Sequence, residues 1–323
     1  MKALTVKEAG APETLQVVEI ETSNPNNNEI VITQTYAGIN YGDAIRRKRG
    51  LFTLNSHGYY VPGFEGVGIV TSVGNEVKDF RVGDRVGYLN AAASGYAEEV
   101  CIAEDYVFSV PNNIPDQDAA ALTCVGATAW HLLNQSLAQK SDWVLVHGAT
   151  GGVGLILVQI ALAKGVKVIA VVGNENKKEF IPQHNNVAVV VRGESDISDR
   201  VLEITNGQGV KVIFDCVGQA VLGANLKCIK KGGTIMYFGS TSGHPEFPGM
   251  PILMNSLTIR GFNIFNLLTD VESWRKDLES FYEFVSANHI KVHISSVFRL
   301  EDTYKAHQLL EDRNSIGKML IKF

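Results

Sequence analysis

The chain has 323 residues, of which 45% are hydrophobic and 20% charged, a composition that suits two ordinary globular domains with large buried cores. Its 29 basic and 34 acidic residues give a net charge of −5, which argues against a broad basic surface for nucleic acid. None of the four cysteines lies in a CxxC pair, which argues against a disulfide scaffold and against a structural zinc knuckle.

The first third of the chain is expected to form short β-strands separated by turns. Strand-like runs occur at 30–36, 67–73, 82–88 and 97–102. Several short strands at such spacing predict a β-barrel or a β-sandwich.

Near residue 118 the pattern changes to alternating helices and strands. After a predicted helix at 118–133, apolar strands are expected at 143–147, 166–172, 187–191, 210–215, 234–239 and 257–262. Helical segments are expected between most of them, near 151–164, 175–181, 196–205 and 219–230. Continuous Val and Ile runs that alternate with helices are typical of a parallel sheet covered on both faces.

The last part of the chain predicts a helix, a strand, a helix and a final strand, at 270–287, 291–298, 300–310 and 318–323. We expect this tail to return to the β-rich part. The fold class is then α/β, with a Rossmann-like, doubly wound parallel-sheet domain at 119–262 and a β-rich domain formed by 1–118 and 263–323.

Residues 143–163 contain no Asp, Glu, Lys or Arg, and a hydropathy scan could mistake them for a membrane span. Their glycines, His147 and Gln159 would expose polar groups to lipid, so a buried strand, turn and helix explain them better. The N-terminus carries no apolar run typical of a signal peptide. We therefore expect a cytoplasmic protein with no membrane partner.

The strongest local signal is the sequence VLVHGATGGVGLILVQ at 144–159. An apolar strand leads into a glycine-rich turn that opens a helix, and glycines let the backbone approach a pyrophosphate whose charge is met by free N–H groups. A glycine-rich loop without a ligand is the alternative. The surrounding strand–helix–strand context favours a dinucleotide.

The end of the second strand indicates which dinucleotide is bound. An NAD site usually places an acid here, about 20 residues after the turn, but this chain has Gly173 and Asn174. Lys177 and Lys178 follow and could pair with a 2′-phosphate, although they could also form a solvated helix face. Glu175 keeps NAD(H) open as an alternative, and the pattern as a whole favours NADP(H).

Short motifs in a fixed order along the whole chain carry a family resemblance. They are AGINYGD at 37–43, PGFEGVG at 62–68, VGDRV at 82–86, GATA at 126–129, the glycine-rich turn, FDCVG at 214–218, GG at 232–233, FGS at 238–240 and GK at 317–318. They resemble the zinc-independent medium-chain dehydrogenases/reductases of the quinone oxidoreductase (zeta-crystallin-like) group. The resemblance implies a GroES-like catalytic domain, a Rossmann domain, and NADPH in the cleft between them. The chain departs from the family signature at Thr150 and Leu162.

The resemblance also implies the site residues. The candidate cofactor-binding residues are Asn40, Thr128, Thr150, Gly151, Gly152, Val153, Gly173, Asn174, Lys177, Arg192, Val217, Phe238, Gly239, Ser240 and Lys318. The candidate catalytic residues are Asn40, Tyr41 and Asp43. Asn40 could instead be a turn residue, and Asp43 could order its loop or pair with Arg46 or Arg47. Family members often carry a tyrosine where this chain has Phe52, and Tyr41, Tyr59 or Tyr60 could replace it.

The zinc ligands of related dehydrogenases are missing from the sequence. Asn40 lies near the position of their first cysteine, and Phe64 replaces the histidine of their Gly-His-Glu motif. Phenylalanine cannot bind a metal and asparagine is a poor zinc ligand. No cysteine occurs at 90–95, where a structural zinc lobe would lie. We expect no metal.

Without a metal, the site is expected to hold nicotinamide C4 near an electrophilic carbon and to stabilise the oxyanion that develops. NADPH-dependent hydride transfer to a quinone is the main prediction. Reduction of α,β-unsaturated aldehydes or ketones is the alternative, because these acceptors also delocalise charge onto oxygen. A non-catalytic, NADPH-gated binding module is a third interpretation. The resemblance implies a homodimer formed through the edge of the Rossmann sheet.

Overall fold

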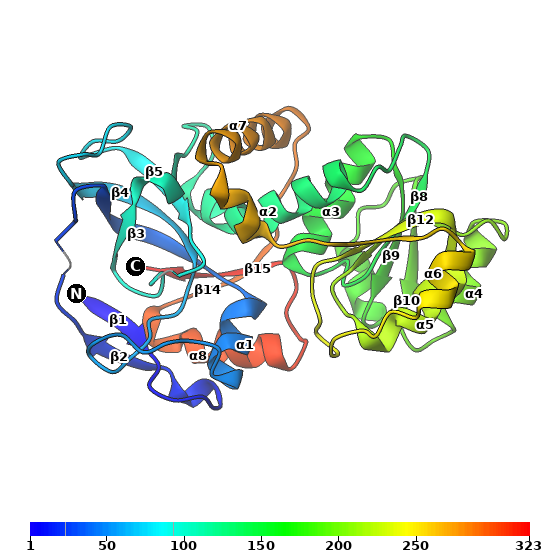
Figure 1. Cartoon of the computed structure of the whole chain (residues 1–323), viewed down its shortest axis with the longest axis horizontal. Helices are drawn as coiled ribbons and strands as arrows, with labels where there is room; N and C mark the ends of the chain where they lie inside the picture. Colours follow the sequence, from blue (N-terminus) through cyan, green and yellow to red (C-terminus); the bar gives the residue numbers. More distant parts are fainter. Residues whose placement is uncertain (23, 93) are drawn as a thin grey trace. The chain divides into compact units, whose positions relative to one another are not determined.

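The computed structural model describes residues 1–22, 24–92 and 94–323, and these divide into two compact units (Figure 1). Unit 1 contains residues 1–125, 265–283 and 292–323, and unit 2 contains 126–264 and 284–291. Three segments differ from the predicted division. Residues 119–125, within helix α2 (Asp116–Gln135), belong to unit 1, and residues 263–264 and 284–291 belong to unit 2.

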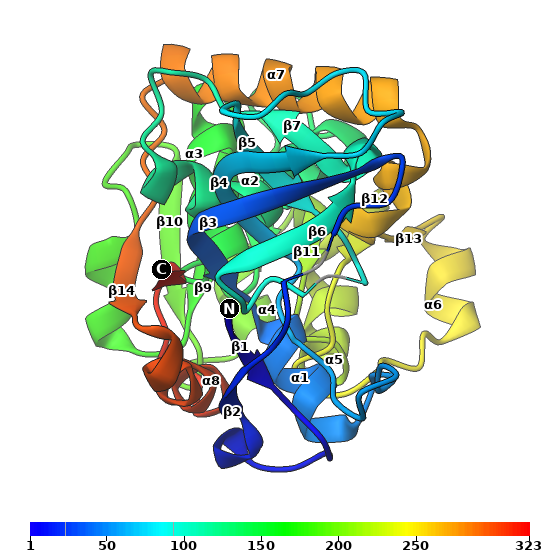
Figure 2. The same ribbon diagram turned by 90° about the vertical axis from the view of Figure 1, so that its left-hand side faces the viewer.

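Unit 1 is built on a seven-stranded sheet, as Figure 2 shows for β3 to β6. Its path is β14 (Ile294–Phe298), β15 (Lys318–Lys322), β3 (Glu29–Ile39), β4 (Glu65–Val73), β5 (Arg85–Leu89) and β7 (Val107–Ser109), with β6 (Glu99–Ala103) also paired to β3. All pairs are antiparallel except β14 with β15. Because β15 pairs with β3, the expected return of the tail to the β-rich part is confirmed.

The remaining elements of unit 1 surround this sheet. They are the antiparallel pair β1 (Lys2–Thr5) and β2 (Gln16–Glu19), the helices α1 (Tyr41–Arg49) and α8 (Thr303–Glu311), most of α7 (Val271–Ala287), and short 3-10 turns at Pro12–Thr14, Glu104–Tyr106 and Leu300–Asp302.

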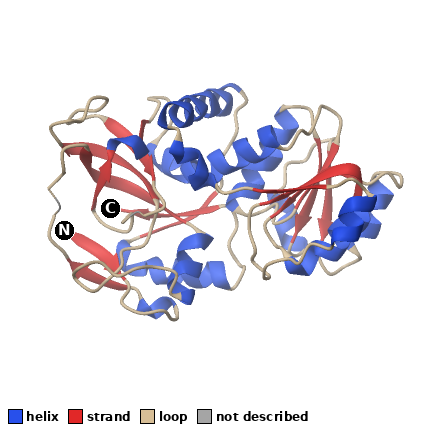
Figure 3. Ribbon diagram, in the orientation of Figure 1, coloured by secondary structure: helices blue, strands red, loops and turns tan. Residues whose placement is uncertain are grey.

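Unit 2 contains a six-stranded, all-parallel sheet with helices on its faces (Figure 3). The order is β10 (Val187–Val191), β9 (Lys167–Val172), β8 (Trp143–Val146), β11 (Val210–Asp215), β12 (Ile229–Tyr237) and β13 (Thr258–Gly261). The helices are α3 (Gly152–Ala163), α4 (Ile197–Ile204), α5 (Gln219–Cys228) and α6 (Gly249–Met254), with a 3-10 helix at Glu175–Phe180. A further 3-10 helix, Ile264–Thr269, begins at the last residue of this segment of unit 2 and continues in unit 1.

The strand order of unit 2 reverses between β8 and β11. In a doubly wound sheet, ligands bind outside the carboxyl ends of the strands at such a switch point. The predicted fold class is confirmed, and the apolar segment 143–163 forms β8, a turn and α3. Within the described residues, no helix has the length and apolar character needed to cross a membrane.

Several predicted boundaries are wrong. The strand predicted at 82–88 begins only at Arg85, because Gly83 has a positive φ of 95° in the preceding turn. The strand predicted at 291–298 begins at Ile294, and the left-handed φ of 51° at His289 belongs to the turn that ends α7. Strand β12 ends at Tyr237, which places Phe238 and Gly239 in a loop. Helix α1 was not predicted.

Candidate functional site

The glycine-rich turn joins β8 to α3 in unit 2. Gly148 has a φ of +61°, and a Cβ on Gly154 would lie 2.3 Å from the Gly148 carbonyl oxygen. Only glycine therefore lets α3 start this close to the turn. The N-cap residue, Gly151, offers no side chain to the first N–H groups of this 12-residue helix. Such a terminus fits a pyrophosphate, and Gly151, Gly152 and Val153 are partly exposed there.

A buried polar network fixes the neighbouring turn at the end of β11. The Oδ1 atom of Asp215 accepts hydrogen bonds from the backbone N–H groups of Val217 (2.7 Å) and Gly218 (2.9 Å). Its Oδ2 atom accepts from Asn225 Nδ2 at 2.9 Å, and Asn225 Oδ1 lies 2.7 Å from His147 Nε2. Burial lowers the pKa of His147, so the neutral ring donates to Asn225. The network holds Val217 at the carboxyl edge of the sheet.

The loop after β12 packs against this turn. The N–H of Phe238 donates to the Asp215 carbonyl (3.0 Å), and the N–H of Thr241 donates to the Cys216 carbonyl (3.2 Å). A Cβ on Gly239 would lie 3.0 Å from the same Cys216 oxygen, so a larger residue would push the two loops apart. The structure therefore brings together the predicted residues Val217, Phe238, Gly239 and Ser240.

Two cations follow the neighbouring strands β9 and β10. Lys177 lies in the 3-10 helix after β9, and the N–H of Arg192, directly after β10, donates to the Val172 carbonyl at the end of β9 (2.9 Å). Burial and, to a smaller extent, the charge of Arg192 lower the pKa of the Lys177 ammonium. Lys178 instead pairs with Glu175 at 2.6 Å. Gly173 and Asn174 are exposed at the strand end, and a Cβ on Gly173 would contact nothing within 4 Å. These features fit a ligand with a second phosphate.

The other candidates in unit 2 are less exposed. Thr128 on α2 and Thr150 in the turn are buried, with 7% and 4% of their surfaces accessible.

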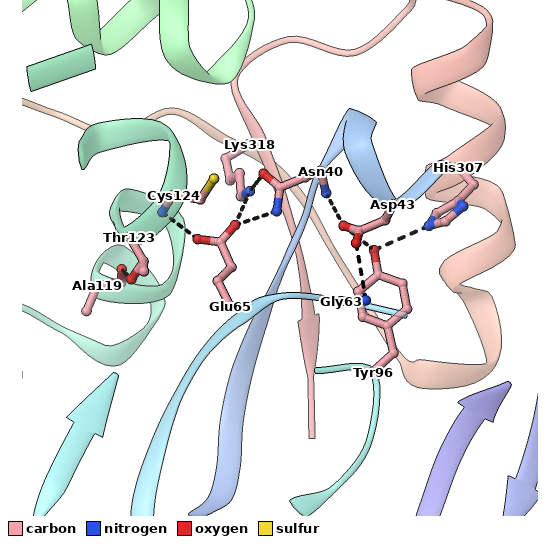
Figure 4. A network of polar contacts seen from close by, with 10 residues as sticks. All are labelled: Asn40, Asp43, Gly63, Glu65, Tyr96, Ala119, Thr123, Cys124, His307 and Lys318. Atoms are coloured by element: carbon pink, nitrogen blue, oxygen red, sulfur yellow. Dashed lines mark hydrogen bonds and ion pairs between the residues drawn. The ribbon is translucent and has the colours of Figure 1, made fainter. Parts of the chain in front are cut away.

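In unit 1, Asn40 is the N-cap of α1 and its side-chain amide is held at both ends (Figure 4). Its Nδ2 atom donates to Glu65 Oε1 at 2.6 Å, and its Oδ1 atom accepts from Lys318 Nζ at 2.6 Å. Lys318 also donates to Glu65 Oε1 at 2.6 Å, and Glu65 Oε2 accepts from the backbone N–H of Cys124 at 2.6 Å. Both Glu65 and Lys318 are buried.

Asp43 lies on the other side of Asn40 and accepts three hydrogen bonds (Figure 4). The donors are the backbone N–H groups of Asn40 (3.0 Å) and Gly63 (3.2 Å) and the hydroxyl of Tyr96 (3.1 Å). Burial is the main cause that raises the pKa of Asp43 to about 6. Apart from catalysis, Asp43 was expected either to order its loop or to pair with Arg46 or Arg47. These contacts correspond to ordering the loop, and Arg47 pairs with Glu311 and not with Asp43.

A chain of hydrogen bonds runs from the buried Arg47 through His307 and Tyr96 to Asp43. Arg47 Nε donates to His307 Nδ1 at 3.3 Å, so the neutral His307 carries its proton on Nε2, which lies 3.3 Å from the Tyr96 hydroxyl. Burial, helped by the Arg47 charge, lowers the pKa of His307 to about 3 and keeps the ring neutral. Tyr96 then donates to Asp43.

Among the three tyrosines considered in place of the missing hydroxyl, Tyr60 is the one that stacks on Phe52. Their ring centroids are 5.0 Å apart with an interplanar angle of 5°. Arg46 hydrogen-bonds the Tyr60 side chain, and its guanidinium also lies over Phe64, 5.8 Å from the ring centroid. Tyr41, at the start of α1, is partly exposed.

Two family models match the chain. The model described as "Alcohol dehydrogenase GroES-like domain" matches residues 26–112, and the model described as "Zinc-binding dehydrogenase" matches 152–283. The chain is 33% identical to "Probable quinone oxidoreductase" of Schizosaccharomyces pombe, over 98% of this chain and 95% of that protein. It is also 33% identical to "Quinone oxidoreductase 1" of Escherichia coli K12, over 97% and 96%. The chain belongs to the quinone oxidoreductase family.

Solved structures of this family share the whole fold. The structure of Escherichia coli quinone oxidoreductase complexed with NADPH aligns with a TM-score of 0.92 at 31% identity, covering all of both chains. That of the Pseudomonas syringae quinone oxidoreductase aligns with a TM-score of 0.91 at 27% identity, covering 100% of this chain and 99% of that one. The resemblance inferred from the motifs is confirmed.

One of the matching family models is described as a zinc-binding dehydrogenase. This member of the quinone oxidoreductase family lacks a zinc ligand at position 64, as the sequence predicted. Phe64 is 5% exposed and packs edge-on against Phe265, with ring centroids 5.2 Å apart. In the part of the chain that the structure describes, no group of three or more His, Cys, Asp or Glu side chains is placed to hold a metal ion.

Sequence reasoning missed several residues that organise this quinone oxidoreductase site. Glu65 and Asp215 stand inside the recognised motifs PGFEGVG and FDCVG, so a carboxylate among apolar residues and glycines was the available signal. His147 stands inside the VLVHGATGGVGLILVQ motif but was given no role there, whereas Tyr96, His307 and Asn225 lie outside the recognised motifs.

Proposed function

We propose that this chain catalyses the NADPH-dependent reduction of a quinone. The observation that carries the proposal is similarity to quinone oxidoreductases over nearly the whole chain, at 33% identity. The uncapped start of α3 suits the pyrophosphate of this cofactor, and the cations Lys177 and Arg192 suit its 2′-phosphate.

In this proposal, unit 2 binds the cofactor. Gly151, Gly152 and Val153 receive the pyrophosphate at the start of α3. Lys177 and Arg192 receive the 2′-phosphate, and Gly173 and Asn174 leave space for the ribose. The loops at 216–218 and 238–240, which Asp215 holds together, line the remaining length of the cofactor. Bound NADPH supplies a hydride, which carries two electrons.

The residues of unit 1 act on the acceptor. A quinone that gains a hydride and one proton from water becomes a hydroquinone, and negative charge collects on its oxygen before the proton arrives. Asn40 donates a hydrogen bond to that oxygen from Nδ2, and Tyr41 lies next to it in the chain. Asp43 holds the backbone of Asn40 rather than the acceptor. A hydrogen-bond donor that is already in position stabilises the transition state most when it faces the atom on which negative charge develops.

The test is NADPH oxidation by EDTA-treated protein, with 1,4-benzoquinone, 9,10-phenanthrenequinone and a 2-alkenal in parallel. We expect turnover with the quinones and little with the alkenal. Asn40→Ala should lower kcat about 100-fold while NADPH still binds. Asn288→Ala, a change at an exposed asparagine beyond α7, is the matched control and should leave kcat unchanged.

Two other outcomes would move the assignment. Preference for the alkenal would make the chain a double-bond reductase. NADPH binding without reduction of any acceptor would support the binding module instead.

We also propose a cytoplasmic homodimer, formed through the edge of the unit 2 sheet. β13 is an edge strand, and the neighbouring α6 exposes Met250 (64%), Leu253 (71%) and Met254 (68%). Leu253→Glu should convert the dimer to a monomer in sedimentation velocity, whereas Leu137→Glu, at a similarly exposed leucine (69%), should not. A monomeric wild type would overturn the proposed homodimer. Recovery of the chain in a membrane fraction would overturn the proposed cytoplasmic location.

A further inference from the structure

Lys318 comes from the last strand of the chain, yet its ammonium lies against the side chain of Asn40. The pairing of β15 with β3 brings Met319 opposite Ile39, which places Lys318 beside Asn40 at the ends of the two strands. Glu65, at the start of β4, completes the group from the other neighbour of β3. Three segments far apart in the sequence therefore meet at one amide (Figure 4).

We propose that Lys318 is a positioning residue for the reaction: together with Glu65 it fixes the amide of Asn40 so that one Nδ2 hydrogen remains for the oxygen of the acceptor. This inference rests on the proposed role of Asn40 in quinone reduction.

The chemistry of the two partners determines the orientation of the amide. An ammonium group can only donate hydrogen bonds, and a carboxylate can only accept them. Lys318 must therefore face Oδ1 of Asn40, and Glu65 must face Nδ2. The flipped amide would set Nδ2 against the ammonium and Oδ1 against the carboxylate, which are two repulsive contacts. Asn40 thus has one fixed orientation, in which the second Nδ2 hydrogen is the donor it can offer.

The burial of Lys318 favours a positioning role over direct binding of the cofactor by its ammonium group. Lys318 is 2% exposed and Glu65 is fully buried, while Asn40 is 8% exposed. Asn40 is therefore the member of the group that a ligand reaches most easily. Two of the three ammonium hydrogens have partners within the group, each at 2.6 Å.

The carboxylate that anchors the group is itself fixed on both oxygens. Oε1 of Glu65 accepts from Asn40 and Lys318, and Oε2 accepts from the Cys124 N–H at the α2 backbone. A Cβ at position 38 would lie 2.3 Å from Oε1, so Gly38 keeps the space that the carboxylate occupies. A buried charge with such complete pairing orients its partners rigidly.

The main variant must remove both charges at once, because Lys318→Met alone would leave Glu65 charged and unpaired in the interior. In Glu65→Gln/Lys318→Met neither charge of this pair remains, so no unpaired partner is left, and the amide of Asn40 loses its directional partners. We expect kcat to fall about 10–100-fold, while the Kd for NADPH, measured by fluorescence titration, stays within about twofold. Combined with Asn40→Ala, the same pair of changes should lower kcat no further.

Two further variants keep the test decisive. Lys318→Arg retains the positive charge for Glu65 but changes the donor geometry, so it should fold and show the same loss of kcat with unchanged Kd. Lys322→Met, at the exposed end of β15, is the matched control and should match wild type in both quantities. A rise in the Kd for NADPH with kcat unchanged would overturn the proposal, as would additive losses in the Asn40→Ala background.

A spectroscopic measurement separates failure of this inference from failure of the proposed function. In protein labelled with 15N-asparagine, the side-chain NH2 of Asn40, assigned by its loss in Asn40→Ala, should give two distinct, slowly exchanging signals. In Glu65→Gln/Lys318→Met these signals should exchange at least about tenfold faster. Unchanged exchange would overturn the positioning role whether or not the wild type reduces quinones, and an inactive wild type with the expected exchange would overturn only the proposed function.

Discussion

The hydroxyl of Tyr96 donates a hydrogen bond to Oδ2 of Asp43 over 3.1 Å, although the two residues are 53 positions apart and both are fully buried. This bond stabilises the carboxylate against the larger effect of burial, which raises the pKa of Asp43 from 3.8 to about 6. The ionised form at neutral pH therefore depends on its hydrogen-bond donors and on the positive charge of Lys318.

The first prediction concerns the pH dependence of stability. The folded pKa of Asp43 lies above its unfolded value, so the folded protein binds the proton more tightly. The contribution of this group is full below about pH 4 and is lost as the pH rises through about 6. Tyr96→Phe removes a donor to the carboxylate, so it should raise the pKa of Asp43 further and extend the loss above pH 6.

Urea unfolding between pH 5 and pH 8 measures this effect. The control is Tyr88→Phe, which removes an equally buried hydroxyl that donates to Gln34 and not to Asp43. Both variants should lose about 1–2 kcal/mol, but only Tyr96→Phe should change the pH dependence. The same pH profile in both variants would contradict the assignment.

The sequence predicted unit 2 more closely than unit 1. Runs such as Val187–Val191 are apolar throughout because a parallel sheet is covered on both faces, so the strands could be located from composition alone. Helix α1 was missed because it has four basic residues in its last turn and little apolar pattern. It is stabilised instead by the capping box of Asn40 and Asp43 and by Gly50, whose φ is 66°.

The site shows the same contrast between local and long-range information. The turn at 148–154 could be predicted, because a phosphate site is built from consecutive glycines at a helix start. The contacts of Lys318 with Asn40 and Glu65 span 278 and 253 positions, and that of Tyr96 with His307 spans 211. These depend on the pairing of β15 with β3 and on the position of α8, which no local pattern specifies.

A second prediction compares two helical glycines of unit 2. Gly154→Ala would place a Cβ 2.3 Å from the Gly148 oxygen and 2.7 Å from the Ala149 Cα, both backbone atoms, so the turn must move. It should lower the melting temperature and weaken NADPH binding. Gly223→Ala in α5 meets nothing within 4 Å and should stabilise the protein by up to about 1 kcal/mol. Calorimetry with NADPH titration tests both, and normal NADPH affinity in Gly154→Ala would count against the phosphate site.

A third prediction concerns the choice between NADPH and NADH. Lys177→Ala and Arg192→Ala should each raise the KM for NADPH about tenfold or more, because each removes a charged partner of the 2′-phosphate. The KM for NADH should change little, since NADH lacks that group. Lys178→Ala is the control, because Lys178 pairs with Glu175. Equal increases in the KM for NADPH and the KM for NADH would instead indicate that the substitutions disturb the fold around Lys177 and Arg192.

The last prediction uses two cations that share one carboxylate. Arg47 has no exposed side-chain surface and pairs with Glu311, the Gly10 carbonyl and His307, whereas Lys48 is 55% exposed and contacts the other oxygen of Glu311. Arg47→Met removes the buried partner of all three groups and should cost about 3–5 kcal/mol in the free energy of unfolding. Lys48→Met should cost less than about 1 kcal/mol, because solvent already screens that pair.

Urea unfolding of the two variants measures this difference directly. The loss in Arg47→Met should persist at high salt, since a buried pair is screened little, while any loss in Lys48→Met should vanish there. Arg47 also lowers the pKa of His307 through its charge, so Arg47→Met should move the titration of that ring upward from about 3. Similar costs for the two variants would mean that Arg47 is far more accessible to water than its packing between α1 and α8 implies.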